Sequence, residues 1–192
     1  MSRSKDIELV ESKADDAGSF TALASVFGNV DAVGDRVMPG AFSETLRNWR
    51  ASGREIPVIF SHQKNDLSAY IGSADPNEVR ETPRGLEVAG KLDVATNPTA
   101  KQVALLLKRG NLNGWSFAYT VPRGGETIAE DGANELHRVD LKEVGPTLQG
   151  ANAEARTLAI KSLETLPDRY RIGGERAKMS ELSVRVAEFA ID

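Results

Sequence analysis

The clearest structural signal in the sequence is the stretch Gly85–Val121, which reads GLEVAGKLDVATNPTAKQVALLLKRGNLNGWSFAYTV. Apolar and polar residues alternate over Gly85–Val94, which predicts a strand with one buried face. The Asn-Pro pair at 97–98 provides an N-cap and a first helical residue, and Gly110 provides a stop, so a helix is predicted between them. A second strand follows over Leu112–Val121, whose one face carries Trp115, Phe117, Tyr119 and Val121.

The rest of the chain adds further strands and helices to this unit. The predicted elements are strands over 5–12 and 19–27, a helix from Pro39 or Gly40 to Ser52, strands over Ile56–His62 and Glu135–Val144, and a helix over about Gly174–Ile191. Because strands do not alternate regularly with helices, the order predicts a mostly β (α+β) fold, a small antiparallel barrel with flanking helices. We expect residues 1–161 to form one domain and residues 162–192 a linker and C-terminal helix.

The composition excludes several classes of function. The 192 residues include 24 Lys and Arg against 28 Asp and Glu, a net charge of −4, which argues against a main role on nucleic acid. The chain contains neither an apolar run long enough to span a membrane nor an N-terminal signal peptide. With no cysteine and two histidines, sulfur-ligated and histidine-rich metal sites are excluded, and no cofactor is expected.

Two residues could carry nucleophilic chemistry. His62 ends an apolar strand, sharing its predicted face with Val58 and Phe60. Its imidazole is either a half-buried packing group or a general base. Ser116 lies mid-strand between two aromatic residues. It is either a small residue that allows close packing or a nucleophile, and a serine nucleophile needs a histidine to take its proton.

Glu143 is the candidate acid. By strand parity it shares a face with Val139 and Leu141, where a carboxylate costs free energy unless it is paired. Either this end of the strand is solvated, or Glu143 pairs with an arginine, or it orients an imidazole. His137 has the same parity and is the rival third member. Parity alone does not place these groups together in space.

Several short motifs follow one another along residues 20–160. They are FGNVD at 27–31, GD at 34–35, MPGAF at 38–42, PVIFSH at 57–62, IG at 71–72, GLEV at 85–88, GKL at 90–92, KRG at 108–110, GWSFAY at 114–119, LKEV at 141–144 and AN at 151–152. In this order they resemble the prohead maturation proteases of tailed bacteriophages, which are structurally related to the herpesvirus assemblin proteases.

The resemblance implies an assemblin-like barrel with serine endopeptidase activity. Ser116 matches the family's nucleophile, His62 its catalytic histidine and Glu143 its acidic residue. The herpesvirus relatives use a second histidine as third member, so His137 stays open. The sequence departs from the family after Val144, where Gly-Pro stands in place of the usual serine, and no oxyanion-hole residue is assigned.

The resemblance also implies a setting. The expected substrates are a scaffolding protein or the scaffold segment of the major capsid protein, and the protease itself, inside the immature phage capsid in the host cytoplasm. A homodimer is expected, with no nucleic-acid or membrane partner. Residues 162–192 are expected to be either a self-cleavage or capsid-docking tail or a core helix. The alternatives are a non-catalytic capsid-assembly or scaffolding module with the same fold, and a β-barrel ligand-binding protein with a deep apolar pocket.

Overall fold

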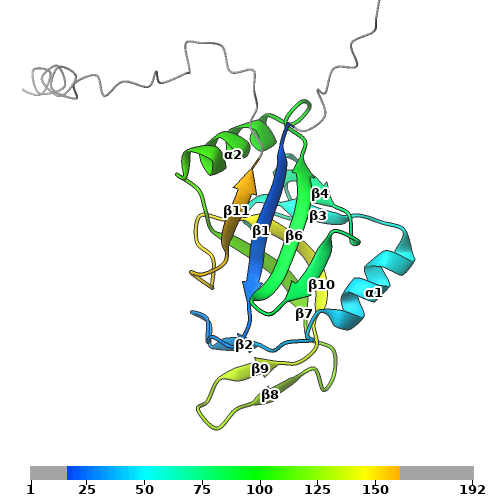
Figure 1. Cartoon of the computed structure of the whole chain (residues 1–192), viewed down its shortest axis with the longest axis vertical. Coiled ribbons are helices and arrows are strands. Elements are labelled where there is room, and N and C mark those ends of the chain that lie inside the picture. Colours follow the sequence, from blue (N-terminus) through cyan, green and yellow to red (C-terminus); the bar gives the residue numbers. More distant parts are fainter. Residues whose placement is uncertain (1–16, 161–192) are drawn as a thin grey trace, which may run out of the picture. The chain divides into compact units, whose positions relative to one another are not determined.

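A strongly curled β-sheet forms the body of the described structure (Figure 1). The computed structural model describes residues 17–160. The strand predicted over 5–12 and the linker and helix predicted over 162–192 therefore lie outside the described residues.

The main sheet has the strand order β11-β1-β6-β4-β3-β10-β7. Strand β5 also pairs with β6, outside this order. Its strands are β1 Ser19–Val26, β3 Ile56–Ile59, β4 Tyr70–Ala74, β5 Val79–Thr82, β6 Gly85–Leu92, β7 Trp115–Thr120, β10 Asp140–Pro146 and β11 Arg156–Ile160. Every pair in this sheet is antiparallel except β3–β10. A bridge between Gly114 and Arg156 joins the outermost strands, β7 and β11, at one end, so the sheet curls into a barrel.

A second, smaller sheet lies at one end of the barrel (Figure 1). It has the order β2-β9-β8, built from β2 Asp35–Val37, β9 Asn134–Leu136 and β8 Glu126–Ile128. No strand was predicted where β2 forms, because a three-residue strand is too short to show a periodic pattern.

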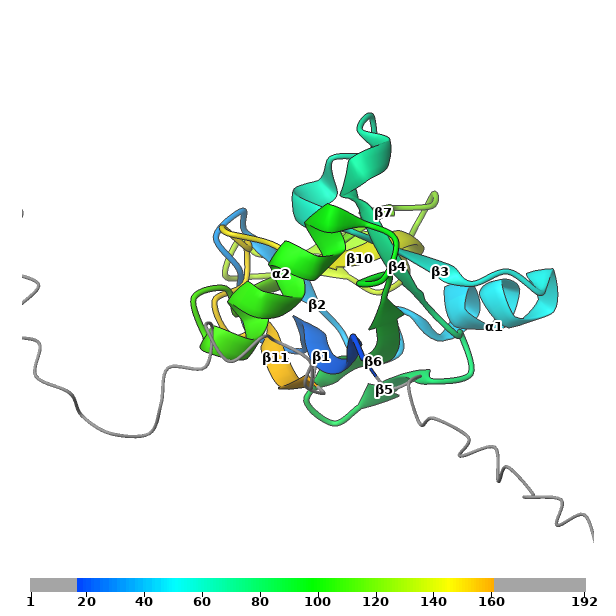
Figure 2. The ribbon, with the colours of Figure 1, turned by 90° about the horizontal axis from the view of Figure 1, so that it is seen from above.

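Two α-helices flank the barrel, as α2 shows most clearly from above (Figure 2). Helix α1, Ser43–Ser52, ends at Gly53 with φ 65°. Helix α2, Pro98–Arg109, has Asn97 as its N-cap and Gly110 as its C-cap, as predicted. Asn97 has two functions: its Oδ1 accepts hydrogen bonds from the first turn of α2, and its Nδ2 donates to the carbonyls of Ser68 and Tyr70.

Alternating residues of the strands fill the barrel. Trp115, Leu86 and Val88 are fully buried, and the ring of Trp115 contacts that of Phe20 with centroids 4.7 Å apart. Phe117 and Tyr119 lie on the same face of β7 and stack on each other. The predicted fold class, mostly β with flanking helices, is confirmed.

Two predicted strands are wrong in their extent. The strand predicted over Ile56–His62 ends at Ile59, and Phe60–His62 form a short 3-10 turn. The strand predicted over Glu135–Val144 is two strands, β9 and β10, in different sheets. The pattern missed both breaks because Phe60 continues the alternation of Val58 at the first, and Val139 has the same parity as Leu141 at the second.

Candidate active site

His62 stands on a backbone turn of unusual conformation. After β3, Ser61 adopts φ 49° and ψ 34°, and His62 adopts φ 57°. A positive φ is uncommon for residues other than glycine and persists only where the surrounding structure enforces it. The amides of Gln63 and Lys64 donate to the carbonyls of Phe60 and His62, at 3.2 and 2.8 Å, and hold the turn. The side chain of His62 therefore leaves the face that strand parity assigned to it.

Glu143 lies next to a β-bulge in β10. In the pairing with β7, Leu141 is opposite Tyr119 and Glu143 is opposite Ala118, so Lys142 is an extra residue. An extra residue reverses the alternation of side chains beyond it. The predicted common face of Leu141 and Glu143 is therefore wrong: Leu141 faces the barrel interior with Tyr119, and Glu143 lies on the opposite face of the sheet.

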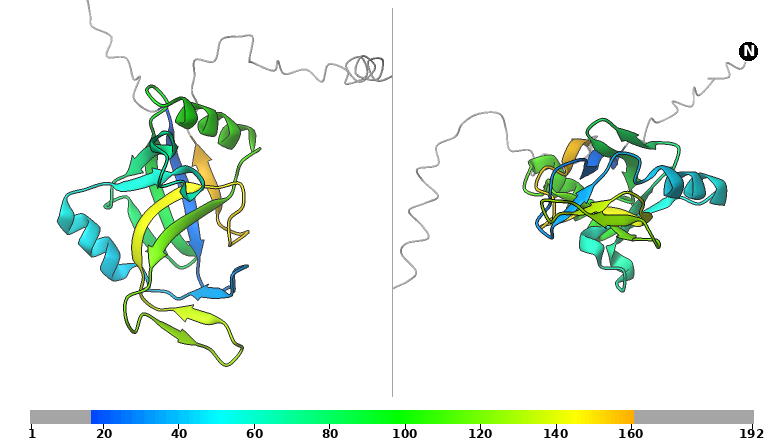
Figure 3. Two further views of the ribbon diagram at one scale, coloured as in Figure 1. Left: turned by 180° about the vertical axis from the view of Figure 1, so that it is seen from behind. Right: turned by 90° about the horizontal axis from the view of Figure 1, so that it is seen from below.

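Ser116 shares this second face. It is paired with Gly145, two pairs along from Ala118 and Glu143, and residues directly opposite in an antiparallel pair point to the same side. Strands β7 and β10 run side by side across the barrel (Figure 3). The half-buried Ser116 is thus a diagonal neighbour of Glu143, on the face away from Trp115 and Phe117.

The turn that carries His62 lies against β10 and β7. A Cβ atom on Gly145 would come within 1.8 Å of the carbonyl oxygen of Ile59. The chain leaving β3 therefore touches the face that carries Ser116 and Glu143. This contact gives a physical reason for the glycine that departs from the family pattern after Val144, since no side chain fits there.

His62 and Glu143 are in direct contact. The Nδ1–H of His62 donates to Glu143 Oε1. The Glu143 side chain is 6% exposed and that of His62 is 36% exposed. Because an ionised carboxylate can only accept, it fixes the proton on Nδ1 and leaves Nε2 as the basic nitrogen. In the described part of the chain, no hydrogen bond joins Ser116 to His62.

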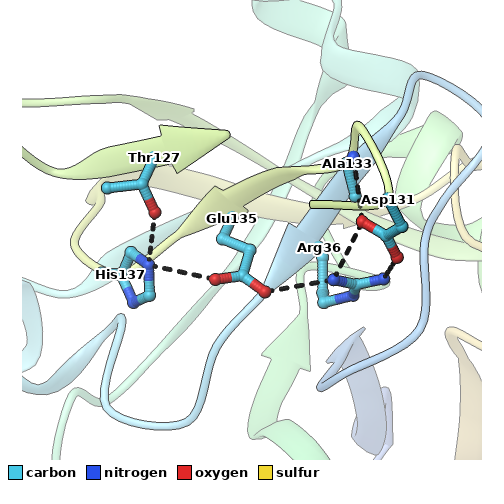
Figure 4. A network of polar contacts seen from close by, with 6 residues as sticks. All are labelled: Arg36, Thr127, Asp131, Ala133, Glu135 and His137. Atoms are coloured by element: carbon cyan, nitrogen blue, oxygen red, sulfur yellow. Dashed lines mark hydrogen bonds and ion pairs between the residues drawn. The ribbon is translucent and has the colours of Figure 1, made fainter. Parts of the chain in front are cut away.

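His137 lies in the smaller sheet and contacts other residues. Its Nε2 is 2.9 Å from Thr127 Oγ1 and 3.4 Å from Glu135 Oε2 (Figure 4). The structure thus brings Glu143, and not His137, into contact with His62.

Sequence reasoning missed three features of this region. The left-handed backbone at Ser61 and the bulge at Lys142 leave no mark in the residue pattern. No polar contact was predicted for Trp49, which lies in the helix predicted up to Ser52. Its indole Nε1 instead donates to the carbonyl of Leu141, 2.9 Å away, and an indole N–H that must find a partner was the available signal.

The described residues lack two further features. Among residues 17–160 there is no group of three or more His, Asp or Glu side chains placed to hold a metal ion. Neither helix in the same range has the length and apolar character needed to cross a membrane.

Two known proteins are similar to parts of this chain. The prohead protease of Enterobacteria phage HK97 is 31% identical over 154 residues, which is 79% of this chain and 65% of that protein. This chain thus spans less than two thirds of the length of that relative. A crystal structure of the KSHV protease in complex with a hexapeptide phosphonate inhibitor is similar over 73% of this chain and 63% of the other, with a TM-score of 0.38 and 12% identity.

A profile of the family described as Caudovirus prohead serine protease matches residues 5–168. The match covers the whole barrel, including the strands β7 and β10 and the turn after β3 that carry the candidate site. The chain therefore belongs to the caudovirus prohead serine protease family.

Proposed function

We propose that this protein is a serine endopeptidase in which Ser116 is the nucleophile, His62 the general base and Glu143 the acid that orients the imidazole. The observation that carries the proposal is the contact between Glu143 Oε1 and His62 Nδ1. A carboxylate on Nδ1 selects the tautomer in which Nε2 can accept a proton, and it stabilises the imidazolium that forms.

The chemistry is acyl transfer. His62 Nε2 takes the proton of Ser116 Oγ as Oγ attacks the carbonyl carbon of the scissile peptide. His62 then gives this proton to the departing amine, which leaves Ser116 acylated. Water, deprotonated by His62, attacks the acyl-enzyme and releases the second product and the free serine. Catalytic hydrogen bonds are often long without substrate, so we infer that substrate binding completes the bond between Ser116 and His62.

The substrates we propose are capsid-assembly proteins: a scaffolding protein or the scaffold segment of the major capsid protein, together with this chain itself. Family membership supports this choice. The site of action is the immature capsid inside the host, where enclosure raises the concentrations of enzyme and substrate. We propose a homodimer as the working form. Self-cleavage would fall in residues 162–192, outside the described structure.

Co-expression with the capsid protein carrying its scaffold segment tests the proposal. The parent chain should cleave the segment, and Ser116→Ala should lose activity by about 10³-fold or more with an unchanged circular dichroism spectrum. Gels and mass spectrometry of the products report the cleavage. The matched control is Ser68→Ala, an exposed serine far along the chain from Ser116, which should cleave like the parent.

Two outcomes would contradict the proposal. Cleavage by Ser116→Ala at the parent rate would exclude the nucleophile. A folded parent chain that cleaves nothing, yet still enters procapsids, would favour the non-catalytic scaffolding module instead.

A further inference from the structure

Leu141 is the residue just before the bulge in β10, and its backbone N–H and C=O bond to side chains outside the sheet. Its amide donates to Thr45 Oγ1, 3.0 Å away, and its carbonyl accepts from Trp49 Nε1 at 2.9 Å. Both polar backbone groups of the residue just before the extra residue thus bond to side chains of α1. A buried backbone group left without a partner is costly, so these two bonds hold Leu141 opposite Tyr119. Val144 is held opposite Val58 and Phe117, so the extra residue has to lie between these two fixed points.

The spacing of Thr45 and Trp49 allows both side chains to reach Leu141. Thr45 and Trp49 are four residues apart and therefore lie on one face of the helix. Thr45 is 4% exposed, and its hydroxyl is the polar group that reaches Leu141. Trp49 is half-buried, with the guanidinium of Arg54 5.3 Å from its ring centroid.

The position of the bulge decides where Glu143 points. With one extra residue at Lys142, Glu143 lies on the face of Ser116 and contacts His62. If β10 continued as a regular ladder beyond Leu141, Lys142 would lie opposite Ala118 and Glu143 opposite Phe117, on the interior face of the barrel. The contact with His62 would then be lost.

We propose that Thr45 and Trp49 are positioning residues: by holding Leu141, they fix the register in which Glu143 faces His62. The inference rests on the proposed function for its effect on catalysis, but its structural part can be tested without activity. Helix α1 is anchored elsewhere as well, because Arg50 donates to the carbonyls of Pro76 and Val79. Loss of one bond to Leu141 should therefore leave the helix in place.

The structural test follows the proton on His62 Nδ1 by NMR in full-length protein carrying Ser116→Ala, which prevents self-cleavage. A proton shared with a carboxylate gives a strongly downfield resonance. We expect this resonance in the Ser116→Ala protein and its loss or marked weakening when Thr45→Val removes the hydroxyl at nearly constant shape. Trp49→Phe, which removes the N–H, should act in the same direction.

Two controls separate positioning from general destabilisation. Thr45→Ser keeps the hydroxyl and should keep the resonance. Leu46→Val, a buried substitution on the same helix with no bond to β10, should lower the thermal stability and keep the resonance. An unchanged resonance in both Thr45→Val and Trp49→Phe would overturn the inference.

The catalytic test uses active Ser116 enzyme. Thr45→Val should lower kcat by about ten- to a hundredfold, the cost of a small misplacement of a catalytic group, with KM changed by less than about twofold. A rise in KM alone would overturn the inference. An inactive parent whose NMR resonance still depends on Thr45 would overturn the proposed function and support the positioning.

Discussion

Residues 17–160 contain two histidine–glutamate pairs, and they differ in which nitrogen meets the carboxylate. In the pair on the barrel, Glu143 binds Nδ1 of His62. In the pair on the smaller sheet, Glu135 and the hydroxyl of Thr127 both approach Nε2 of His137 (Figure 4). A relay needs the acid on one nitrogen and the hydroxyl on the other. His, Glu and a hydroxyl residue gathered together are therefore not enough to make a triad.

The two carboxylates also differ in charge environment. Glu135 is shared with the guanidinium of Arg36, 3.1 Å away, which also binds Asp131. Its side chain is 22% exposed, against 6% for Glu143. The positive charge of an arginine beside a partly exposed carboxylate offsets the attraction of that carboxylate for a nearby imidazolium. The comparison teaches that burial and the choice of nitrogen distinguish the pair that we propose as catalytic from the other one.

The largest effect should separate the two histidines. His62→Ala should lower kcat for scaffold cleavage by about 10⁴-fold or more, since it removes the only base the mechanism uses. His137→Ala should change kcat by less than about threefold, as expected for a side chain outside the proposed mechanism. Equal losses in the two variants, with both proteins folded by circular dichroism, would break the distinction drawn here.

The two glutamates should differ nearly as much. Glu143→Gln keeps the shape but presents an amide to Nδ1, and the wrong tautomer should lower kcat by about 10⁴-fold. Glu135→Gln is the matched control on the smaller sheet and should retain parent activity. Initial rates on one purified substrate measure both, and a Glu143→Gln enzyme within tenfold of the parent would remove Glu143 from the mechanism.

Two glycines provide a smaller test, in stability. In Gly145→Ala the new Cβ would meet the carbonyl of Ile59, so we expect a loss of about 1–3 kcal/mol in the free energy of unfolding, and lower activity because the turn carrying His62 must shift. Gly124→Ala, at φ 72° with nothing within 4 Å, should lose about 1 kcal/mol from backbone strain alone and keep activity. Urea unfolding measures both; equal losses would show that the turn yields easily.

The smallest effect is a titration on the smaller sheet. The hydrogen bond from Arg36, followed by that from the amide of Ala133, lowers the pKa of Asp131 below its ordinary value of 3.8. This ion pair is therefore complete above pH 4 and is lost as pH falls through the lowered pKa. Arg36→Gln should raise the pKa of Asp131 toward 3.8, measured by carbonyl NMR, and leave peptidase activity unchanged. An unmoved midpoint would show that Arg36 does not set it.

Local signals in the sequence were enough for much of the fold. The caps of α2 were predicted residue by residue, and so was the aromatic face of β7. The ordered motifs led to the family and to the residues now proposed as the site. The strands β4 and β11 were missed because their sequences, YIGSA and RTLAI, do not alternate between apolar and polar residues.

The geometry of the site could not be predicted in the same way. Strand parity placed Glu143 beside Leu141, and one extra residue reversed that assignment. The turn at His62 depends on a left-handed backbone at Ser61 that residue types do not announce. Both features are set by packing between distant segments, and a pattern within one segment carries no information about them.

Asn97 has a consequence for how this sequence can vary. Statistics of helix starts treat Asn, Asp and Ser as nearly equal choices. Here the amide also bridges to the carbonyls of Ser68 and Tyr70, a few residues after His62. Aspartate would satisfy the helix but turn a second acceptor toward two carbonyls, and serine is too short to reach them. Substitutions among capping residues that are harmless at other helices should therefore not be tolerated at position 97, where only asparagine makes both sets of bonds.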